Sequence, residues 1–291
     1  MVLMSGVQPA SVIRQSCTKR SGEYEKSYGR RPALAVVLVG DNPSSRSYVR
    51  TKRRACEQVG IDHRDFFLAS SVSQEALLEL VAGLNADDSV DGILVQLPLP
   101  PGIDERLVID SIDPAKDVDG FTPVNMGNLL IGNPCLAPCT PAGILEMIDY
   151  YSISTEGKSI CIIGRSNIVG KPLAAMLMQR NRNATVTVCH SQTPDLRRHT
   201  LNADIIISAV GHPALVDADM VSPGAVVIDV GITRVEDPAA EKGFRWVGDC
   251  DFDALSLKCS AITPVPGGVG PMTIAMLMAN TVKAAFARRA E

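Results

Sequence analysis

A lysine lies on the apolar face of a short and otherwise basic helix. The segment SYVRTKRRACEQVG (47–60) has helical periodicity, with Tyr48, Cys56 and Val59 on its apolar stripe. Lys52 falls on the same stripe, four residues after Tyr48 and four before Cys56. Such a lysine commonly extends its amine into water. Alternatively, burial lowers the pKa of the amine until it can accept a proton near neutral pH, as a general base does.

A glutamine ends the apolar part of DGILVQLPLP (91–100), a pattern that predicts a buried strand stopped by prolines. Gln96 then lies at the carboxyl end of that strand, where open α/β sheets bind ligands. Because a buried amide needs hydrogen-bond partners, Gln96 either caps nearby backbone or contacts a substrate or a catalytic side chain. An amide could orient the Lys52 amine without the negative charge that would raise its pKa.

Three aspartates, Asp113, Asp117 and Asp119, follow in the loop DPAKDVDGFTP (113–123). The residues alone favour a solvated acidic loop, or aspartates that form turns with Gly120, over a ligand contact. The sequence has no histidine–carboxylate cluster, so a catalytic divalent metal is not expected.

A glycine-bearing turn connects a strand pattern to a helix pattern in KSICIIGRSNIVGKP (158–172). Gly164 and Gly170 bracket Ser166, and such a turn aims backbone amides and a helix N-terminus at a phosphate. The spacing G-x-S-x-x-x-G meets the G-x-G-x-x-G fingerprint only in part. An ordinary strand-to-helix turn is the alternative.

The next strand pattern indicates which dinucleotide would bind. A free ribose 2′-hydroxyl usually meets an acidic residue at that strand end, but this strand ends in VCHSQT (188–193), with no carboxylate. Arg165 and Ser191 offer a cation and a hydroxyl, which suit a 2′-phosphate and favour NADP over NAD. His190 is either a cofactor contact or a surface or capping histidine.

The loop ITPVPGGVGPMTIAML (262–277) is rich in proline and glycine. A rigid turn with few side chains lets a ligand touch the backbone directly. It could equally be a tight connection between domains, and both roles are compatible.

The elements around these residues predict an α/β fold. Near-continuous apolar strand patterns, beginning at 34–40, alternate with helical patterns, which is typical of parallel βαβ units. The alternation restarts after a helical pattern at 140–151. We therefore expect a catalytic domain over residues 1–150 and a Rossmann-like domain over 151–271, with a final helix, 272–291, packed back on the catalytic domain.

The composition excludes several classes of protein. The 291 residues carry a net charge of −4 and no basic tract, which disfavours nucleic acid and membrane surfaces as partners. No secretory signal and no uncharged apolar run of transmembrane length are recognised. The eight cysteines are scattered, without the spacing of a zinc site, and favour a reducing, cytoplasmic compartment.

Together the motifs resemble those of the bifunctional methylenetetrahydrofolate dehydrogenase/methenyltetrahydrofolate cyclohydrolase family. The similar segments occur in the family's order and span residues 33–285; QLPLP and PGGVGPMT are the most specific. The resemblance implies a homodimer and a two-domain fold with the active site in the interdomain cleft. It also implies oxidation of 5,10-methylenetetrahydrofolate with NADP⁺, followed by hydrolysis to 10-formyltetrahydrofolate.

The resemblance assigns roles to residues of the first domain. Lys52 would be the catalytic lysine of hydrolysis, Tyr48 would stack on the folate and Gln96 would hold and tune Lys52. Asp119 would bind the amino-pyrimidine edge of the pterin, and Leu97 would contact the substrate. The other residues expected beside the folate are Pro266, Gly267 and Gly268.

The resemblance also assigns a cofactor site. Arg165, Ser166 and Ser191 would hold the NADP phosphates, with Arg165 and Ser191 nearest the 2′-phosphate. Ile232 and Thr273 would lie near the nicotinamide half. The remaining residues expected at this site are Gly164, Ile168 and Gly170.

Residues 1–30 depart from the family pattern. The usual Ile-Asp-Gly-like strand before the first helix is not recognisable, and a segment with a central glycine replaces the more helical leader. This departure concerns the assignment of the first strand and of the sheet edge, and it does not concern the catalytic residues.

Two other functions are weighed: a dehydrogenase with little hydrolytic activity, and a folate-binding protein without catalysis, which would not need a proton-transfer lysine.

Overall fold

Residues 1–240 and 243–289 are described by a computed structural model. They form two compact units. The six-stranded unit combines Met1–Ala10 with Thr140–Thr273, and the three-stranded unit combines Ser11–Cys139 with the chain from Ile274 onward.

The division falls elsewhere than the expected boundary at residue 150. The helix α6 (Cys139–Tyr150) belongs almost entirely to the six-stranded unit. There Gly143 packs so closely on Met272 that an added Cβ would lie 2.8 Å from the Met272 Cβ. The chain after Ile274, the greater part of the last helix, groups with the three-stranded unit.

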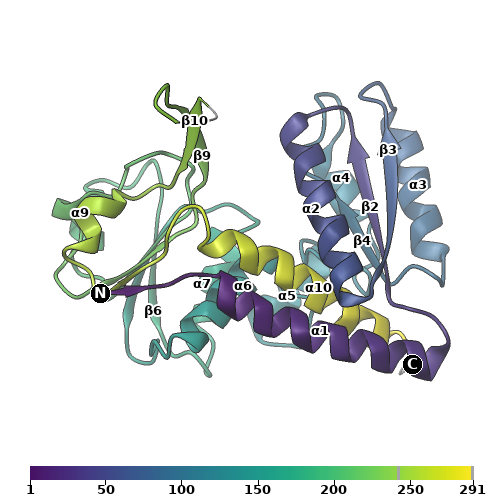
Figure 1. The fold of residues 1–291 in the computed structure, drawn as a ribbon, viewed down its shortest axis with the longest axis horizontal. Coiled ribbons are helices and arrows are strands. Elements are labelled where there is room, and N and C mark those ends of the chain that lie inside the picture. Colours follow the sequence, from purple (N-terminus) through teal and green to yellow (C-terminus); the bar gives the residue numbers. More distant parts are fainter. Residues whose placement is uncertain (241–242, 290–291) are drawn as a thin grey trace. The chain divides into compact units, whose positions relative to one another are not determined.

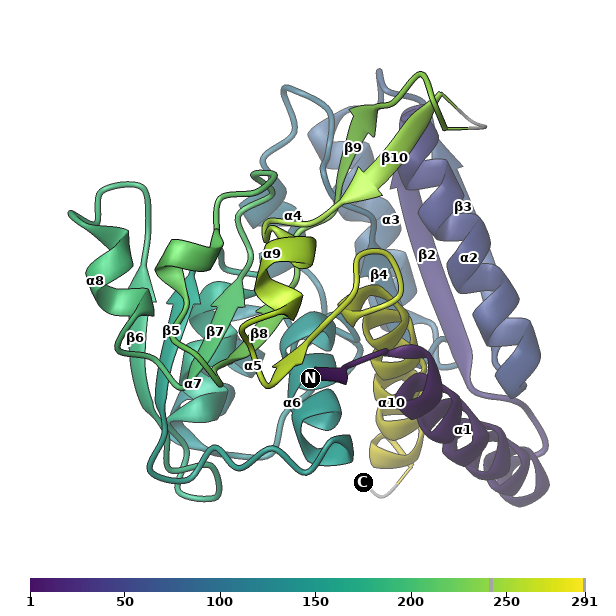
Figure 2. The same cartoon turned by 60° about the vertical axis from the view of Figure 1, so that its left-hand side comes forward.

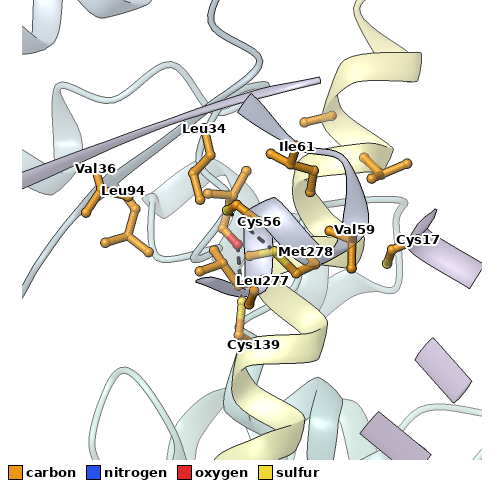
Figure 3. Packing of buried hydrophobic residues seen from close by; sticks show 14 of the residues in the cluster. Cys17, Leu34, Val36, Cys56, Val59, Ile61, Leu94, Cys139, Leu277 and Met278 are labelled. Atoms are coloured by element: carbon orange, nitrogen blue, oxygen red, sulfur yellow. Dashed lines mark hydrogen bonds between the residues drawn. The ribbon is translucent and has the colours of Figure 1, made fainter. Parts of the chain in front are cut away.

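The three-stranded unit is built on a parallel sheet in the order β3-β2-β4. Its central strand β2 is buried along its whole length because helices cover both faces (Figure 1). Leu34 and Val36 pack with residues of α2 and α10 (Figure 3), whereas Ala35 and Val37 pack with residues of α3. The strands and helices are β2 (Ala33–Val39), β3 (Asp62–Leu68), β4 (Gly92–Val95), α2 (Pro43–Val59), α3 (Gln74–Ala86), α4 (Glu105–Asp110) and α5 (Pro123–Ile131).

The six-stranded unit is a parallel sheet in the order β1-β11-β8-β7-β5-β6 (Figure 2). The chain moves from β5 to β6 on one side and then returns to β7 on the other, so the strand order reverses between β5 and β7. In open α/β sheets the crevice at this reversal, at the carboxyl ends of the strands, is the usual ligand site. The main strands are β5 (Ser159–Ile163), β6 (Thr185–Cys189), β7 (Ile205–Ser208), β8 (Val226–Asp229) and β11 (Ala261–Ile262).

Shorter elements complete this unit. An antiparallel hairpin pairs β9 with β10 after the carboxyl end of β8. The bounds are β9 (Thr233–Glu236), β10 (Phe244–Val247), α7 (Gly170–Leu177), α8 (Leu196–Thr200), α9 (Phe252–Ser256) and the 3₁₀ helix η1 (Ala218–Met220).

The N-terminal residues contain the edge strand that the sequence did not reveal. The strand β1 (Val2–Leu3) pairs in parallel with β11, with Val2 opposite Ala261. Two exposed residues are too short to give a periodic pattern. The helix α1 (Val7–Tyr28) then runs through Gly22 without a break, because the spacing of Cys17, Ser21 and Tyr24 gives it a continuous buried face.

The helix α10 (Val269–Ala287) is apolar around most of its circumference. Among the described residues, α10 is the one helix that is long and apolar enough to cross a membrane. Of its most apolar 18-residue stretch, 56% is buried within the fold. The core helix of a globular protein meets the same criterion, so this feature is weak evidence for a membrane span.

Candidate active site

Lys52 and Gln96 are joined by a direct hydrogen bond. The Lys52 Nζ donates to Gln96 Oε1 at 2.9 Å, and Gln96 Nε2 donates to the Leu97 carbonyl at 2.7 Å. The Gln96 backbone amide continues the sheet by donating to the Val37 carbonyl at 2.8 Å. Both ends of the amide group are therefore used, which fixes its oxygen toward the lysine.

Burial lowers the pKa of the Lys52 amine, although the Asp119 carboxylate, and more weakly the Cys139 and Cys56 thiols, act to raise it. The uncharged Gln96 is therefore not the only group that acts on the lysine, because a carboxylate also interacts with it. Asp119 is close enough to interact with Lys52, but the loss of solvation outweighs the attraction. The amine therefore holds its proton less tightly than the amine of a free lysine, which is what a general base at neutral pH requires.

Asp119 is a partly buried carboxylate in the loop beyond β4. Burial raises its pKa, the Lys52 ammonium lowers it, and Asp117 raises it further. Leu97 and Asp119 line one small cavity, together with Phe121. The cavity brings two residues of the predicted substrate set together.

Neighbouring charged residues hold this loop in place. Asp117 accepts backbone hydrogen bonds from Gly120 at 2.9 Å and Thr122 at 2.7 Å, so the turn-forming interpretation of this aspartate is confirmed. The buried Lys116 donates to three carbonyls at the end of α3, and its own carbonyl accepts from the Ile93 amide of β4 at 2.7 Å. Asp119 is thus carried by a segment anchored on both sides.

Two further residues secure the Asp119 segment and were not identified from the sequence. The Cys139 thiol donates to the Val118 carbonyl at 3.3 Å. The Asn280 amide donates to the Val118 and Ala137 carbonyls, both at 2.8 Å. The one available signal was an asparagine within the apolar pattern of the last helix.

Tyr48 lies one helical turn before Lys52 but is not buried with it. Its exposed fraction is 47%, whereas Val49, Ala55, Cys56 and Val59 are buried. The prediction that Tyr48 belongs to the buried stripe was therefore wrong, because the buried face of α2 is rotated toward Val49. The exposed ring is available to a flat ligand.

An ion pair ties α2 to the sheet directly after Lys52. Arg53 pairs with Asp65 of β3, whose side chain is buried. Asp65 also lies 3.1 Å from the His63 Nδ1. Burial first, and then the Arg53 and Lys52 charges, lower the pKa of His63 to about 4, so the imidazole is neutral at pH 7.

The glycine turn of the six-stranded unit leaves no room for side chains. Gly164 has φ +117°, and an added Cβ would lie 2.6 Å from the Ala209 carbonyl oxygen. A Cβ at Gly170 would lie 2.1 Å from the Gly164 carbonyl oxygen. Ser166 Oγ accepts from the Val169 amide at 3.1 Å, which leaves the hydroxyl hydrogen for a ligand.

Arg165 and Ser191 are both exposed, at the ends of the adjacent strands β5 and β6. The Gly164 amide donates to the Cys189 carbonyl at 2.9 Å and so connects these two strand ends. His190 Nδ1 accepts from the Gln192 amide at 3.2 Å, which supports a turn-forming role. Ile168 and Ile232 are exposed apolar side chains of the same unit.

The remaining predicted residues lie in the loop between β11 and α10 and in the first turns of α10. The Thr273 hydroxyl is 2.9 Å from the Thr140 hydroxyl. Pro266 follows a cis peptide bond, Gly267 has φ +100°, and its carbonyl accepts from the Gly6 amide at 2.9 Å. A Cβ on Gly268 would lie 2.5 Å from the Pro264 carbonyl oxygen, so close backbone packing accounts for much of this loop's composition.

All eight cysteines are free. Among residues 1–240 and 243–289, no group of three or more histidines, cysteines or acidic residues could hold a metal ion.

Two domain models of one protein family match this chain, one over the N-terminal part and one over the C-terminal part. The model of the tetrahydrofolate dehydrogenase/cyclohydrolase catalytic domain matches residues 4–119, and the NAD(P)-binding domain of that family matches residues 138–289. The bifunctional protein FolD of Salinibacter ruber is 57% identical over 259 residues, which are 89% of this chain and 87% of that protein.

Solved structures show the same likeness. The bifunctional enzyme FolD, a methylenetetrahydrofolate dehydrogenase/cyclohydrolase from Campylobacter jejuni, has a TM-score of 0.94 at 49% identity, covering 99% of each chain. The methylenetetrahydrofolate dehydrogenase-cyclohydrolase of Trypanosoma brucei, complexed with NADP cofactor and an inhibitor, has a TM-score of 0.94 at 40% identity. That comparison covers 100% of this chain and 99% of the other.

Proposed function

The chain belongs to the tetrahydrofolate dehydrogenase/cyclohydrolase family, and from this premise we propose how its residues perform the family's two reactions. It is a bifunctional enzyme of one-carbon metabolism. It oxidises 5,10-methylenetetrahydrofolate with NADP⁺ to the 5,10-methenyl form, and it hydrolyses that product to 10-formyltetrahydrofolate.

The observation that carries the hydrolytic role is the bond between Lys52 Nζ and Gln96 Oε1, at 2.9 Å. Burial lowers the pKa of this lysine, so a larger fraction of it is the neutral amine at neutral pH. Gln96 aims the amine without adding a charge. We propose Lys52 as the proton-transfer residue and Gln96 as the residue that orients it.

We propose that Lys52 carries one proton between the two stages of hydrolysis. Water adds to the methenyl carbon, and Lys52 accepts one of its protons as the C–O bond forms. The ammonium then returns that proton to N5 while the C–N5 bond breaks, and the remaining hydroxyl proton is lost as the formyl carbonyl forms. One proton is released to solvent overall, and Lys52 ends in its starting state.

We propose that the folate is held by groups around this pair. Asp119 is a carboxylate acceptor for the amino-pyrimidine edge, which offers neighbouring N–H donors. Tyr48 supplies an exposed ring for stacking, and Leu97 an apolar contact. The other residues that we retain as folate neighbours are Pro266, Gly267 and Gly268.

The residues of the six-stranded unit fit a dinucleotide. Gly164 and Gly170 leave open the space that a Cβ would fill, which suits a phosphate approaching backbone amides. We propose that Arg165, Ser166 and Ser191 bind the phosphates. Ile232 and Thr273 would contact the nicotinamide half, and Ile168 would also border the cofactor. NADP⁺ supplies the hydride acceptor when bound, and the chain contributes position and orientation.

Two other functions receive less support. A dehydrogenase with little hydrolytic activity would have no use for a lysine whose pKa is lowered and whose amine is aimed by a glutamine. A folate-binding protein without catalysis would need neither that lysine nor a nucleotide turn. Following the methenyl and formyl products separately distinguishes all three functions.

Steady-state oxidation of methylenetetrahydrofolate with NADP and with NAD tests the proposed cofactor site. We expect a clear preference for NADP, and we expect Arg165→Ala to raise the KM for NADP about tenfold, because a charge-assisted bond to the 2′-phosphate is lost. The KM for NAD should change little. Arg180→Ala, at an exposed arginine beyond α7, is the matched control. An NAD preference in the parent enzyme would contradict the assignment of Arg165 and Ser191.

We propose that the protein is a homodimer. Within the described three-stranded unit, β3 pairs with β2 on one side only, and its Phe67 side chain is exposed. An unpaired edge with an exposed aromatic residue suits pairing with a second copy about a two-fold axis. Light scattering should give twice the mass of one chain, and Phe67→Lys should shift the protein toward the monomer. A monomeric parent protein would exclude the proposal.

We also propose a cytoplasmic location. Eight free cysteines suit a reducing compartment. Fractionation of the source cells checks this location, and recovery with a membrane or secreted fraction would contradict it.

A further inference from the structure

Asp249 lies in the loop after β10, has an exposed fraction of 0%, and has no role in the site described so far. Its Oδ2 accepts from Ser208 Oγ at 3.0 Å and from the Val210 amide at 2.8 Å. Its Oδ1 accepts from the His212 amide at 2.9 Å. All three donors belong to the end of β7 or to the loop 209–212 that follows it.

Asp229 ends β8, has an exposed fraction of 4%, and holds Asp249 in turn. Its Oδ1 accepts from the Gly231 amide at 3.0 Å and from the Asp249 amide at 2.9 Å. Its Oδ2 accepts from the Cys250 amide at 2.9 Å. The two carboxylates therefore form one network that fixes the backbone after β7 and after β8.

Two glycines make room for this network. A Cβ on Gly231 would lie 2.0 Å from an Asp249 carboxylate oxygen, and a Cβ on Gly248 would lie 1.9 Å from an Asp229 carboxylate oxygen. The Asp249 carboxylate thus fills the space beside Gly231, and the Asp229 carboxylate fills the space beside Gly248. The arrangement leaves little freedom to either loop.

Burial raises the pKa of Asp229 to about 6, while the Asp249 and Cys250 amides lower it and the Asp249 charge raises it. Above neutral pH this carboxylate is ionised, and both of its oxygens remain acceptors for backbone N–H groups.

The loop after β7, which Asp249 holds, borders the reversal of strand order between β5 and β7. The loop after β8 is joined to it, because the Val230 amide donates to the Ser208 carbonyl at 2.8 Å. The Ala209 amide donates to the Ile163 carbonyl at 2.9 Å, and the Ala209 carbonyl is the atom that a Cβ on Gly164 would strike. The loop 209–212 is therefore packed directly on the glycine turn. The side chains of Val210 and Ile232 remain exposed. The Val210 amide is bound by Asp249, and the amide of Gly231, the residue before Ile232, is bound by Asp229.

We propose that Asp229 and Asp249 are positioning residues of the dinucleotide site, a pair that sets loops 209–212 and 230–232 for the nicotinamide-bearing half of the cofactor. They act through the backbone that they hold and do not touch the cofactor. The proposal rests on the proposed binding of NADP in this unit. The three groups that Asp249 binds lie at the end of β7 or in the loop that packs on the glycine turn, which is why the proposal concerns this site.

The bifunctional reaction provides the test, because hydrolysis of methenyltetrahydrofolate consumes no NADP. Asp249→Asn keeps the size of the side chain, but its NH₂ group cannot accept from the Val210 amide and the Ser208 hydroxyl. We expect the KM for NADP, and the Kd by calorimetry, to rise about tenfold or more. The dehydrogenase kcat at saturating NADP should change less than about threefold, and hydrolysis measured without NADP less than about twofold.

Asp204→Asn is the matched control, since Asp204 accepts from the Ser159 amide at 2.9 Å at the amino edge of the same sheet. It should leave the KM for NADP unchanged. Ser208→Ala removes a single donor to Asp249 and serves if Asp249→Asn does not fold; its KM for NADP should rise about threefold.

An unchanged KM and Kd for NADP in folded Asp249→Asn or Ser208→Ala would overturn the positioning role. An equal loss of hydrolysis would also overturn it, because the effect would then be general destabilisation. A parent enzyme that neither binds NADP nor oxidises methylenetetrahydrofolate would refute the proposed function itself, which is a separate result.

Discussion

Lys52→Met is expected to lower the rate of methenyltetrahydrofolate hydrolysis by about 10²–10⁴-fold, the usual contribution of a positioned proton-transfer group. Methionine fills a similar volume without an ionisable amine, so α2 should keep its packing on the sheet. The Gln96 oxygen loses its donor, and no other described cation is bonded to it. Stopped-flow or steady-state loss of methenyl absorbance measures the rate.

Arg50→Met is the matched control for this change, because Arg50 lies on the same helix and is exposed. It should hydrolyse the substrate at the parent rate. Hydrolysis by Lys52→Met at the parent rate would remove the lysine from the mechanism.

Gln96→Glu tests whether the partner of Lys52 must be uncharged, because it keeps a hydrogen-bond acceptor at position 96 and adds a negative charge. The parent hydrolysis rate should rise with pH through the pKa of Lys52, which burial places below the usual 10.5. A carboxylate at position 96 favours the ammonium form and raises that pKa, so the profile should move to higher pH. Gln96→Met should be slower at every pH without that movement. Identical profiles for the glutamate variant and the parent would show that Lys52 is not the titrating base.

Asp119→Ala should weaken folate binding about 10–100-fold, because hydrogen bonds to a charged acceptor contribute about 1.5–3 kcal/mol. The partly buried carboxylate is carried by a segment that Lys116, Asp117 and Asn280 anchor independently, so its removal should leave the loop in place. Binding of NADP should change little. Calorimetry with a folate analogue and with NADP measures both affinities.

Asp113→Ala is the control from the same loop, since the Asp113 carboxylate accepts from the Ala115 amide at 2.9 Å and so forms a turn. It should leave folate affinity unchanged. Equal losses of folate and NADP affinity in Asp119→Ala would argue against a contact with the pterin.

The sequence predicted those features that leave a local pattern. The strands β2, β4 and β5 are near-continuous apolar runs, and the end of one such run predicted the position of Gln96 at a strand end. The pairing of Gln96 with Lys52 came from the family resemblance. The glycine turn was recognisable because Gly164 and Gly170 occur at a fixed spacing after a strand. In each case a few neighbouring residues determine the feature.

Other features depend on residues that are distant along the chain. The strand β1 exists because two residues pair with β11, some 260 positions later. The attraction of Asp119 for Lys52, and the support of Val118 by Asn280, arise only when separate elements pack together. Tyr48 was misplaced because helical spacing defines a stripe but not which edge of it faces the sheet.

The reciprocal fit of two glycines and two aspartates has a consequence for how this protein can change over generations. Gly231 makes room for the Asp249 carboxylate, and Gly248 makes room for that of Asp229. A Cβ at either glycine would collide with the facing carboxylate, so we expect a larger residue there to be accepted only together with a smaller residue in place of that aspartate. We therefore expect each glycine and its facing aspartate to change together and not one at a time.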